Sequence, residues 1–199
     1  MTEKLVIEIW KKKNPDEITK ELSSADSRLE VGSAAAMTAA SAAALAGRVA
    51  SVCENNERIE YLKRNIEIIR SYMIHLIDED VKSRGPLRQA LKEGEAYKIE
   101  AAIEPAVCIP AEIVNMTVQL TDFISELAEL CPKESMHRLG EAVRLAVGAA
   151  ESCRIYIMDM ASRSSDETYR FVTRRENELT FEALHRAVEN IMEKVEAAI

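Results

Sequence analysis

Apolar residues recur at intervals of three and four over much of this chain, and the most regular series covers residues 59–80. The series consists of Ile59, Leu62, Ile66, Ile69, Met73, Leu76 and, at its last position, Asp80. Spacing of this kind places every member on one face of an α-helix, as in the helices of a bundle. The pattern therefore predicts a long helix that buries one face and carries a carboxylate at the end of that face.

Two later segments repeat this spacing. The first follows Pro110 and consists of Ile113, Met116, Leu120, Phe123, Leu127 and Leu130, and the second consists of Phe181, Leu184, Val188, Ile191 and Val195. Each segment predicts a further long bundle helix. A helical pattern also resumes at Glu95. We expect Pro105 and Pro110 to kink that helix or to divide it, because proline lacks the backbone N–H that continues helical hydrogen bonding.

Residues 31–48 form an alanine-rich segment that carries no charge between Gly32 and Gly47. Its side chains are nearly all Ala, Ser or Thr, so neighbouring backbones are able to approach this helix closely on more than one side. The run is shorter and less apolar than the roughly 20 residues of a membrane span, which favours a buried helix and no membrane partner. We expect the free N–H groups at Gly32 and Ser33 to receive an anion or a polar ligand.

A second helix rich in small residues is expected to begin around Ser135. Its small residues are Gly140, Ala142, Ala146, Gly148, Ala149 and Ala150. Close contact between two helices needs small side chains on both surfaces. We therefore expect this helix to pack against the alanine-rich segment.

Polar segments separate the predicted helices. The predicted boundaries are residues 54–57, 83–86 and 162–165, with a cap at Asp166. Near the start, Leu5, Ile9 and Trp10 share one helical side, and Asn14 followed by Pro15 predicts a short helix that runs to about Ser24. Together the segments predict an all-α fold, an up-and-down helical bundle of about five to seven helices, in a single domain over residues 1–199.

Composition and charge limit which classes of binding partner are expected. The chain has 199 residues, of which 47% are hydrophobic, and its formal net charge is -8. Phosphate binding needs a clustered basic face, so we expect no nucleic-acid partner and favour a small ligand or a protein. The four cysteines have no C-x-x-C spacing and no signal-like apolar segment follows the charged start, which favours reduced thiols in the cytoplasm. No dinucleotide or phosphate-loop motif is present, so no tightly bound cofactor is expected.

Asp80 is the best candidate for a functional group in the periodic series. A carboxylate at a core-facing position is costly to bury unless it is paired or used. The alternative is that the series has reached the end of the bundle and that the Asp80 carboxylate is exposed to solvent there.

The chain contains two Glu-x-x-His pairs, Glu134 with His137 and Glu182 with His185. They are a poor match to a di-iron site because no further inward-facing glutamates accompany them, so no metal is expected.

The order of these features resembles the cyclodeaminase/cyclohydrolase family, which includes the cyclodeaminase domain of formiminotransferase-cyclodeaminase and methenyltetrahydrofolate cyclohydrolase. The resemblance rests on Gly32 and Ser33 before the alanine-rich helix, on the acidic segment I-D-E-D-V at residues 77–81, and on residues 137–140 and 154–158. It covers the chain from about Ile18 to the last helix. It implies an all-helical bundle that forms a homodimer and acts on one-carbon units carried by tetrahydrofolate.

The resemblance also implies roles for single residues. Asp80 would be catalytic, because the carbon between two nitrogens of a methenyl or formimino folate is electrophilic and its reaction needs a carboxylate that steers water or relays protons. The substrate-binding residues would be Gly32, Ser33, Asp78, Arg138 and Arg154. We expect the two arginines to pair with Asp80 or to bind a carboxylated ligand, and ordinary surface salt bridges are the alternative.

The expected function is thus hydrolysis of the cyclic amidinium of methenyltetrahydrofolate or deamination of formiminotetrahydrofolate. The alternative is a non-catalytic homologue that binds another ligand or a protein partner through the same cleft. Three departures from the family pattern motivate this alternative. The Pro- and Gly-rich start is replaced by S-R-L-E-V-G-S at residues 27–33, an aspartate is replaced by Arg138, and two asparagines are replaced by Arg154 and Met158.

Overall fold

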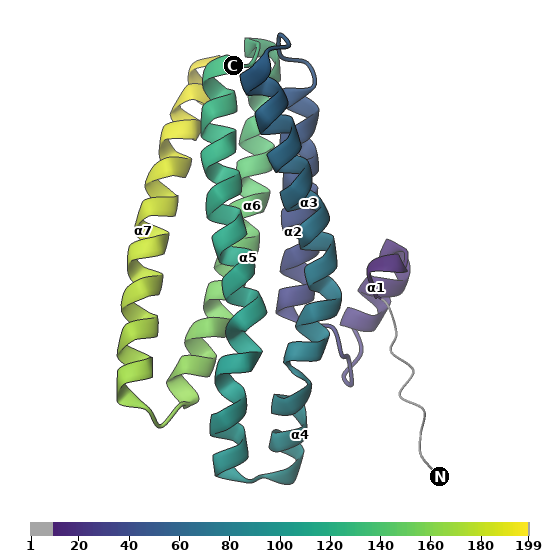
Figure 1. Ribbon diagram of the computed structural model, residues 1–199, viewed down its shortest axis with the longest axis vertical. Helices are drawn as coiled ribbons and strands as arrows, with labels where there is room; N and C mark the ends of the chain where they lie inside the picture. Colours follow the sequence, from purple (N-terminus) through teal and green to yellow (C-terminus); the bar gives the residue numbers. More distant parts are fainter. Residues whose placement is uncertain (1–9, 199) are drawn as a thin grey trace.

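The computed structural model describes residues 10–198, and every regular element in this part of the chain is helical (Figure 1). The elements are η1 (Trp10–Lys12), α1 (Pro15–Leu22), α2 (Val31–Ala50), α3 (Glu57–Ser83), α4 (Gly85–Glu93), α5 (Ala96–Leu130), η2 (Lys133–Ser135), α6 (Met136–Arg163) and α7 (Glu167–Ala198). The predicted all-α fold is confirmed. The predicted apolar side of Leu5 and Ile9 lies outside the described residues.

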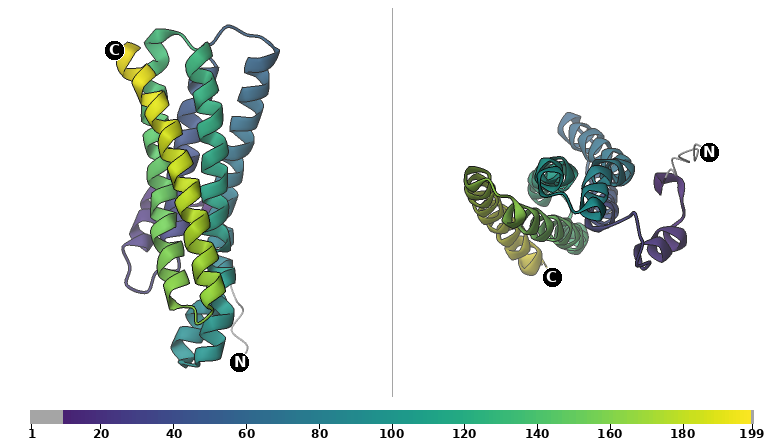
Figure 2. Two further views of the ribbon diagram at one scale, coloured as in Figure 1. Left: turned by 90° about the vertical axis from the view of Figure 1, so that its left-hand side faces the viewer. Right: turned by 90° about the horizontal axis from the view of Figure 1, so that it is seen from below.

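The long helices α2, α3, α5, α6 and α7 lie lengthwise, and consecutive ones run in opposite directions (Figures 1 and 2). Within the bundle, α2 packs against α3, α5 and α6, and α5 packs against α3, α6 and α7. The α4 helix and the start of α5 extend beyond the other helices at one end, and α1 lies beside the bundle near the start of α2 (Figure 1). The arrangement confirms an up-and-down bundle.

Small side chains allow α2 to lie between its neighbours. Its fully buried alanines are Ala36, Ala39, Ala42, Ala43, Ala46 and Ala50. Because each of them projects only a methyl group, α3 and α6 both approach the α2 backbone closely. The predicted contact between the alanine-rich segment and α6 is confirmed. Gly140 allows close contact between α6 and α7 instead, since a Cβ at that position would lie 3.1 Å from Cγ1 of Val195 on α7.

The α5 helix corrects one prediction. Both Pro105 and Pro110 lie inside a single continuous helix, so of the two predicted outcomes, a kink or a division, the division is wrong. Each proline removes one backbone hydrogen bond. Contacts with other helices along α5 supply the stability that its backbone loses at these two points, since tertiary packing contributes most of the stability of helices in proteins.

The buried surface of α5 is also wider than the predicted stripe. Met116 and Phe123 are half-buried and Leu130 is 42% exposed. Buried positions outside the predicted stripe include Val114, Thr117, Thr121 and Ile124. The physical reason is that α5 contacts helices on several sides, so no single face holds all of its buried residues.

Side chains cap three of the predicted helix starts, those of α1, α3 and α7. Asn14 Oδ1 accepts a hydrogen bond from the Glu17 N–H at 2.9 Å, and the Glu17 carboxylate accepts one from the Asn14 N–H at 3.0 Å, which completes a capping box. Asn56 caps α3 and Asp166 caps α7 through two backbone N–H groups each. The α1 helix ends at Leu22, slightly before its predicted end.

Among the described helices, α5 is long and apolar enough to cross a membrane by length and composition alone. It lies within the bundle, in contact with α2, α3, α4, α6 and α7. A buried core helix of this length meets the same criterion, so length and composition do not distinguish a core helix from a membrane-spanning helix.

The close packing of α2 predicts a strong position dependence for enlarged side chains. Replacement of the fully buried Ala39 by Leu should destabilise the fold by about 1–3 kcal/mol, because the extra carbons have no space between α2 and its neighbours. The same change at Ala44, on the exposed side of α2, should alter stability by less than about 0.5 kcal/mol. Urea unfolding of both variants measures the difference, and equal effects would contradict the packing described here.

Candidate functional site

The periodic series of α3 ends at Asp80, and all of its members are buried. Asp80 itself is 0% exposed, and its carboxylate faces the first turn of α2. There the Ser33 N–H donates a hydrogen bond of 2.9 Å to Asp80 Oδ2, and Ser33 Oγ donates one of 2.8 Å to the same oxygen. The predicted inward orientation of Asp80 is confirmed, and the alternative of a wet carboxylate at the end of the bundle is wrong.

The start of α2 was expected to receive an anion or a polar ligand, and in the structure the Asp80 carboxylate occupies that position. Glu30 is the N-cap residue of α2, and its side chain makes no capping hydrogen bond. The N–H of Ser33 is one of the first-turn groups that lack a partner within the helix, so it is free to bind Asp80. The positive end of the helix dipole further favours a carboxylate here.

Gly32 allows the carboxylate to approach this closely. A Cβ at position 32 would lie 2.1 Å from Asp80 Oδ1 and 2.5 Å from its Cγ, which is much closer than two such atoms can approach. Oδ1 is fully buried and has no hydrogen-bond partner among the described residues. A buried acceptor in this state is costly unless the carboxyl group is protonated or a bound ligand donates to it.

Arg84 and Glu30 close the site on its outer side. Arg84 lies one helical turn after Asp80, and only 5% of its surface is exposed. Its guanidinium lies over the ring of Tyr156 on α6, 4.3 Å from the ring centre, and its Nη2 donates to the Glu30 carboxylate. The Glu30 side chain is 41% exposed. The three charged groups are thus ordered by depth, with Glu30 outermost, Arg84 below it and Asp80 deepest.

Burial sets the protonation behaviour of this cluster. Burial raises the pKa of the Asp80 carboxyl above its ordinary value of 3.8, although the Arg84 charge and the hydrogen bonds from Ser33 oppose the rise. Burial, together with the Asp80 charge, also raises the pKa of the Cys153 thiol to about 12, so Cys153 is not a nucleophile at neutral pH. A carboxyl with a raised pKa exchanges protons more effectively near neutral pH, as a general acid or base must.

Comparison with known proteins assigns the family. The sequence model of the formiminotransferase-cyclodeaminase family matches residues 15–179, well over half of the chain. The chain belongs to the formiminotransferase-cyclodeaminase family. The crystal structure of formiminotetrahydrofolate cyclodeaminase from Thermotoga maritima matches with a TM-score of 0.86 and 18% sequence identity, over 94% of this chain and 97% of that chain. At this identity the match shows a shared fold. No curated protein sequence matches the chain.

Asp78 does not lie with Asp80 in this member of the family. Its Oδ1 accepts hydrogen bonds from the N–H of Trp10 at 2.7 Å and of Lys11 at 3.3 Å, and the Lys11 ammonium lies 3.9 Å from Oδ2. Residues two apart on a helix point in different directions, so Asp78 faces η1 while Asp80 faces α2. Asp78 thus attaches the N-terminal segment to α3, apart from Asp80, and its substrate-binding role stays a prediction.

The two arginines predicted to pair with Asp80 also lie elsewhere. The Arg154 guanidinium lies over the ring of Phe181 on α7, 4.9 Å from its centre. Arg138 is in the first turn of α6, at the opposite end of the bundle (Figure 1). It precedes Cys153, which lies near Asp80, by 15 residues, or about 22 Å along the helix. The predicted pairing of Arg138 and Arg154 with Asp80 is therefore wrong.

Sequence reasoning missed Arg84 and Tyr156 as parts of the site, and it placed Glu30 at the entry to α2 without a partner. Arg84 follows Asp80 by four residues, the spacing of one helical turn, but it falls in the predicted boundary at residues 83–86. In the structure Arg84 is the C-cap residue of α3 and keeps helical backbone angles, so the two side chains share a face. The positions of Tyr156 and Glu30 depend on how α6 and the start of α2 pack against α3. No periodicity along the chain contains that information.

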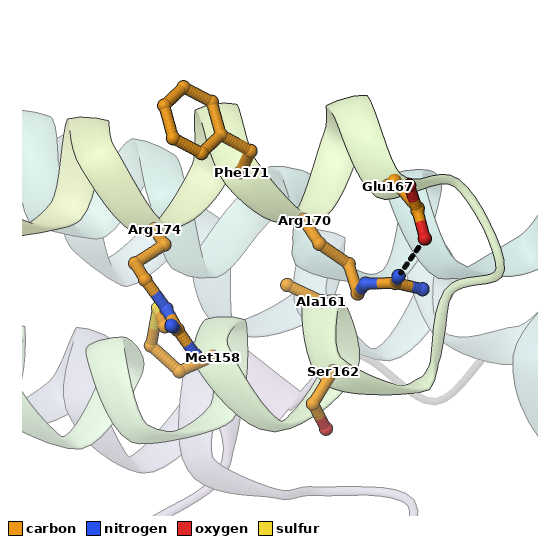
Figure 3. A pocket seen from close by; sticks show the side chains of 7 residues that line it. All are labelled: Met158, Ala161, Ser162, Glu167, Arg170, Phe171 and Arg174. Atoms are coloured by element: carbon orange, nitrogen blue, oxygen red, sulfur yellow. Dashed lines mark hydrogen bonds and ion pairs between the residues drawn. The ribbon is translucent and has the colours of Figure 1, made fainter.

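Figure 3 shows a separate cavity of about 250 Å³ between the end of α6 and the start of α7. Its lining residues are Met158, Ala161, Ser162, Glu167, Arg170, Phe171 and Arg174. Arg170 is held there by the backbone oxygen of Ser164 at 2.7 Å and by Glu167 at 3.5 Å. Asp80 does not line this cavity, and with no exposed surface it is closed to solvent.

Within residues 10–198, no group of three or more His, Cys, Asp or Glu side chains is placed to hold a metal ion. His185, from one of the two Glu-x-x-His pairs, lies on the surface and contacts Glu151 of α6 at 2.9 Å.

The contact between Gly32 and Asp80 predicts a severe effect of one methyl group. Gly32→Ala should lower the free energy of unfolding by about 2–4 kcal/mol, because the new Cβ displaces the carboxylate and breaks its bonds to Ser33. Gly148→Ala is the matched control, since a Cβ there meets no atom within 4 Å and should stabilise α6 by about 0.5–1 kcal/mol. Denaturant unfolding distinguishes the two, and a tolerated Ala at position 32 would refute this geometry.

The raised pKa of Asp80 predicts how stability changes with pH. Between the ordinary value of 3.8 and the raised pKa, the folded state binds more protons than the unfolded state. The contribution of Asp80 to stability is therefore fully present below pH 3.8 and is lost as the pH rises through the raised pKa. Asp80→Asn should lack this loss, so its stability relative to wild type should increase with pH.

Unfolding in urea at several values between about pH 4 and pH 8 measures this trend. Asp122→Asn, on the exposed side of α5, is the control and should follow the wild-type profile. Parallel profiles for wild type and Asp80→Asn would show that Asp80 does not titrate as described.

Proposed function

We propose that the chain acts on the one-carbon unit of a tetrahydrofolate derivative, with Asp80 as the general acid and base. The observation that carries the proposal is the Asp80 carboxyl itself, which is fixed by Ser33, removed from water and raised in pKa. Membership in the formiminotransferase-cyclodeaminase family supports a folate-related substrate. The reaction is hydrolysis of the methenyl derivative or deamination of the formimino derivative.

The proposed chemistry needs one group that both accepts and donates a proton. In hydrolysis, water adds to the electrophilic carbon between two nitrogens, and Asp80 accepts the proton that the water loses. One carbon–nitrogen bond then breaks, Asp80 returns the proton to the departing nitrogen, and the added hydroxyl releases its own proton to solvent as it becomes the carbonyl oxygen of a formyl group. In deamination of the protonated formimino group, the neighbouring folate nitrogen that does not carry this group attacks the formimino carbon. The attacking nitrogen gives its proton to Asp80, and Asp80 passes that proton to the nitrogen that leaves as ammonia.

Gly32 and Ser33 have a positioning role in this proposal. Ser33 donates two hydrogen bonds to Asp80 Oδ2, one from its N–H and one from its Oγ, and Gly32 provides the space for the carboxylate. The free Oδ1 is then the oxygen that exchanges the proton with substrate. A fixed carboxylate of this kind loses little orientational freedom when the reaction occurs.

A second candidate function is binding of a ligand or a protein partner without turnover. The closure of the site supports it, since Asp80 has no exposed surface and Arg84 and Glu30 lie over it. Binding of a reduced folate without its conversion would favour this second candidate. Conversion that depends on Asp80 would favour the enzyme.

We expect purified protein to hydrolyse methenyltetrahydrofolate or deaminate formiminotetrahydrofolate, and Asp80→Asn to lower kcat by about 100-fold or more, because it removes the proton-transfer group. Binding of the folate, measured by calorimetry, should persist in this variant. Asp122→Asn should keep wild-type activity, as its side chain is exposed on α5. Absence of both folate binding and turnover in the wild type would refute the proposal, as would full activity of Asp80→Asn.

A homodimer and a cytoplasmic location stay predictions from the resemblance and the composition. The outward side of α2 is consistent with a partner of the same kind, since Ser41 and Ala44 are small and exposed there. Small side chains on an open helix face permit close approach of another helix.

A further inference from the structure

Arg84 is a buried cation whose hydrogen-bonding capacity is only partly used. About 5% of the residue is exposed, and its Nη1 is fully buried with no acceptor among the described residues. Its Nη2 donates to Glu30, and its plane is held against the Tyr156 ring. A buried donor without an acceptor costs free energy, so the site favours any ligand that supplies an oxygen to this guanidinium.

Arg88 shows what a purely structural arginine looks like in the same region. It lies one turn after Arg84, and its Nη1 and Nη2 donate to the backbone oxygens of Arg28 and Val81, each at 3.2 Å. Both terminal nitrogens of Arg88 therefore have acceptors. The unused Nη1 of Arg84 is a specific property of that residue and not of the surrounding segment.

Glu30 is an exchangeable partner for Arg84. Its side chain is 41% exposed, it precedes α2 at the N-cap position, and it makes no capping bond to the helix. Water competes for the half-exposed Glu30 carboxylate, and the buried Arg84 guanidinium keeps a partner when another oxygen takes the place of Glu30. A ligand oxygen therefore replaces Glu30 at small cost.

We propose that Arg84 binds an oxygen acceptor of the substrate, a carbonyl or a carboxylate, and that Glu30 occupies this position until the substrate displaces it. Displacement frees the Arg84 side chain to move outward with the ligand, which uncovers Asp80 beneath it. The inference rests on the proposed function, because it assigns Arg84 to the same folate-binding site. The planar guanidinium of Arg84 is suited to bind a carbonyl or carboxylate oxygen, and the Tyr156 ring orients the guanidinium.

Calorimetric titration with 5-formyltetrahydrofolate tests the assignment. Arg84→Gln should weaken binding by about 10- to 100-fold, which is the effect of losing a charged hydrogen bond. Glu30→Gln should strengthen binding by about two- to fivefold, because the competing carboxylate is neutralised. Arg88→Gln should bind within about twofold of wild type, since Arg88 bonds only backbone oxygens in this segment.

Two partial ligands identify the oxygen. Tetrahydrobiopterin carries the ring carbonyl without the glutamate, and p-aminobenzoylglutamate carries the carboxylates without the ring. The fragment that contacts Arg84 should lose affinity in Arg84→Gln, and the other fragment should not. Arg84→Lys gives a folded comparison that keeps the charge and loses the planar fork, and it too should bind the contacting fragment more weakly.

Wild-type affinity in both Arg84 variants would overturn the inference while leaving the proposed function intact. Weaker binding by Glu30→Gln would also overturn it, because Glu30 would then support the ligand and not compete with it. If wild type and Glu30→Gln both fail to bind any of the three compounds, the proposed function falls and this inference falls with it.

Discussion

The structure depends on one interaction, the Asp80 carboxylate bound to the first turn of α2. It joins the end of α3 to the start of the central helix through two hydrogen bonds from Ser33 to a single oxygen. Desolvation of a carboxylate is expensive, so the carboxylate needs those donors and the dipole of α2. The same requirement explains Gly32, because any side chain there would collide with Asp80. The alanine side chains that follow let α3 and α6 remain close to α2 along the bundle.

This interaction is incomplete in a way that links structure to function. One carboxylate oxygen is fully bonded, while Oδ1 is buried without a donor, and the nearest positive charge is on Arg84, which is itself only partly bonded. A core selected for stability alone would satisfy or remove such groups. Buried, unsatisfied and titratable groups that occur together are typical of sites that bind or transform a ligand. The half-exposed Glu30 then explains why a closed site is compatible with that role.

Periodicity predicted the part of the site that lies on one helix. The spacing of α3 placed Asp80 on the inward face but left open whether that face is still buried at its last position, whereas the small residues of α2 and α6 were sufficient to predict their contact. Contacts across helices could not be predicted in this way. Asp78 and Arg154 are each two residues from a site residue, so their side chains point to other neighbours, η1 and Phe181. The proline positions of α5 were misleading because tertiary packing, which a local pattern does not contain, outweighed two lost hydrogen bonds.

The account depends on a buried Asp80 carboxyl whose pKa is raised by its surroundings. The most direct measurement is an NMR titration that follows the side-chain carboxyl carbon of Asp80 in the folded protein, with Asp80→Asn used to assign the signal. The account predicts a titration midpoint above the ordinary value of 3.8. A midpoint at or below that value would mean that Ser33 and Arg84 outweigh burial, and Asp80 would then be a structural anion and not an acid–base group.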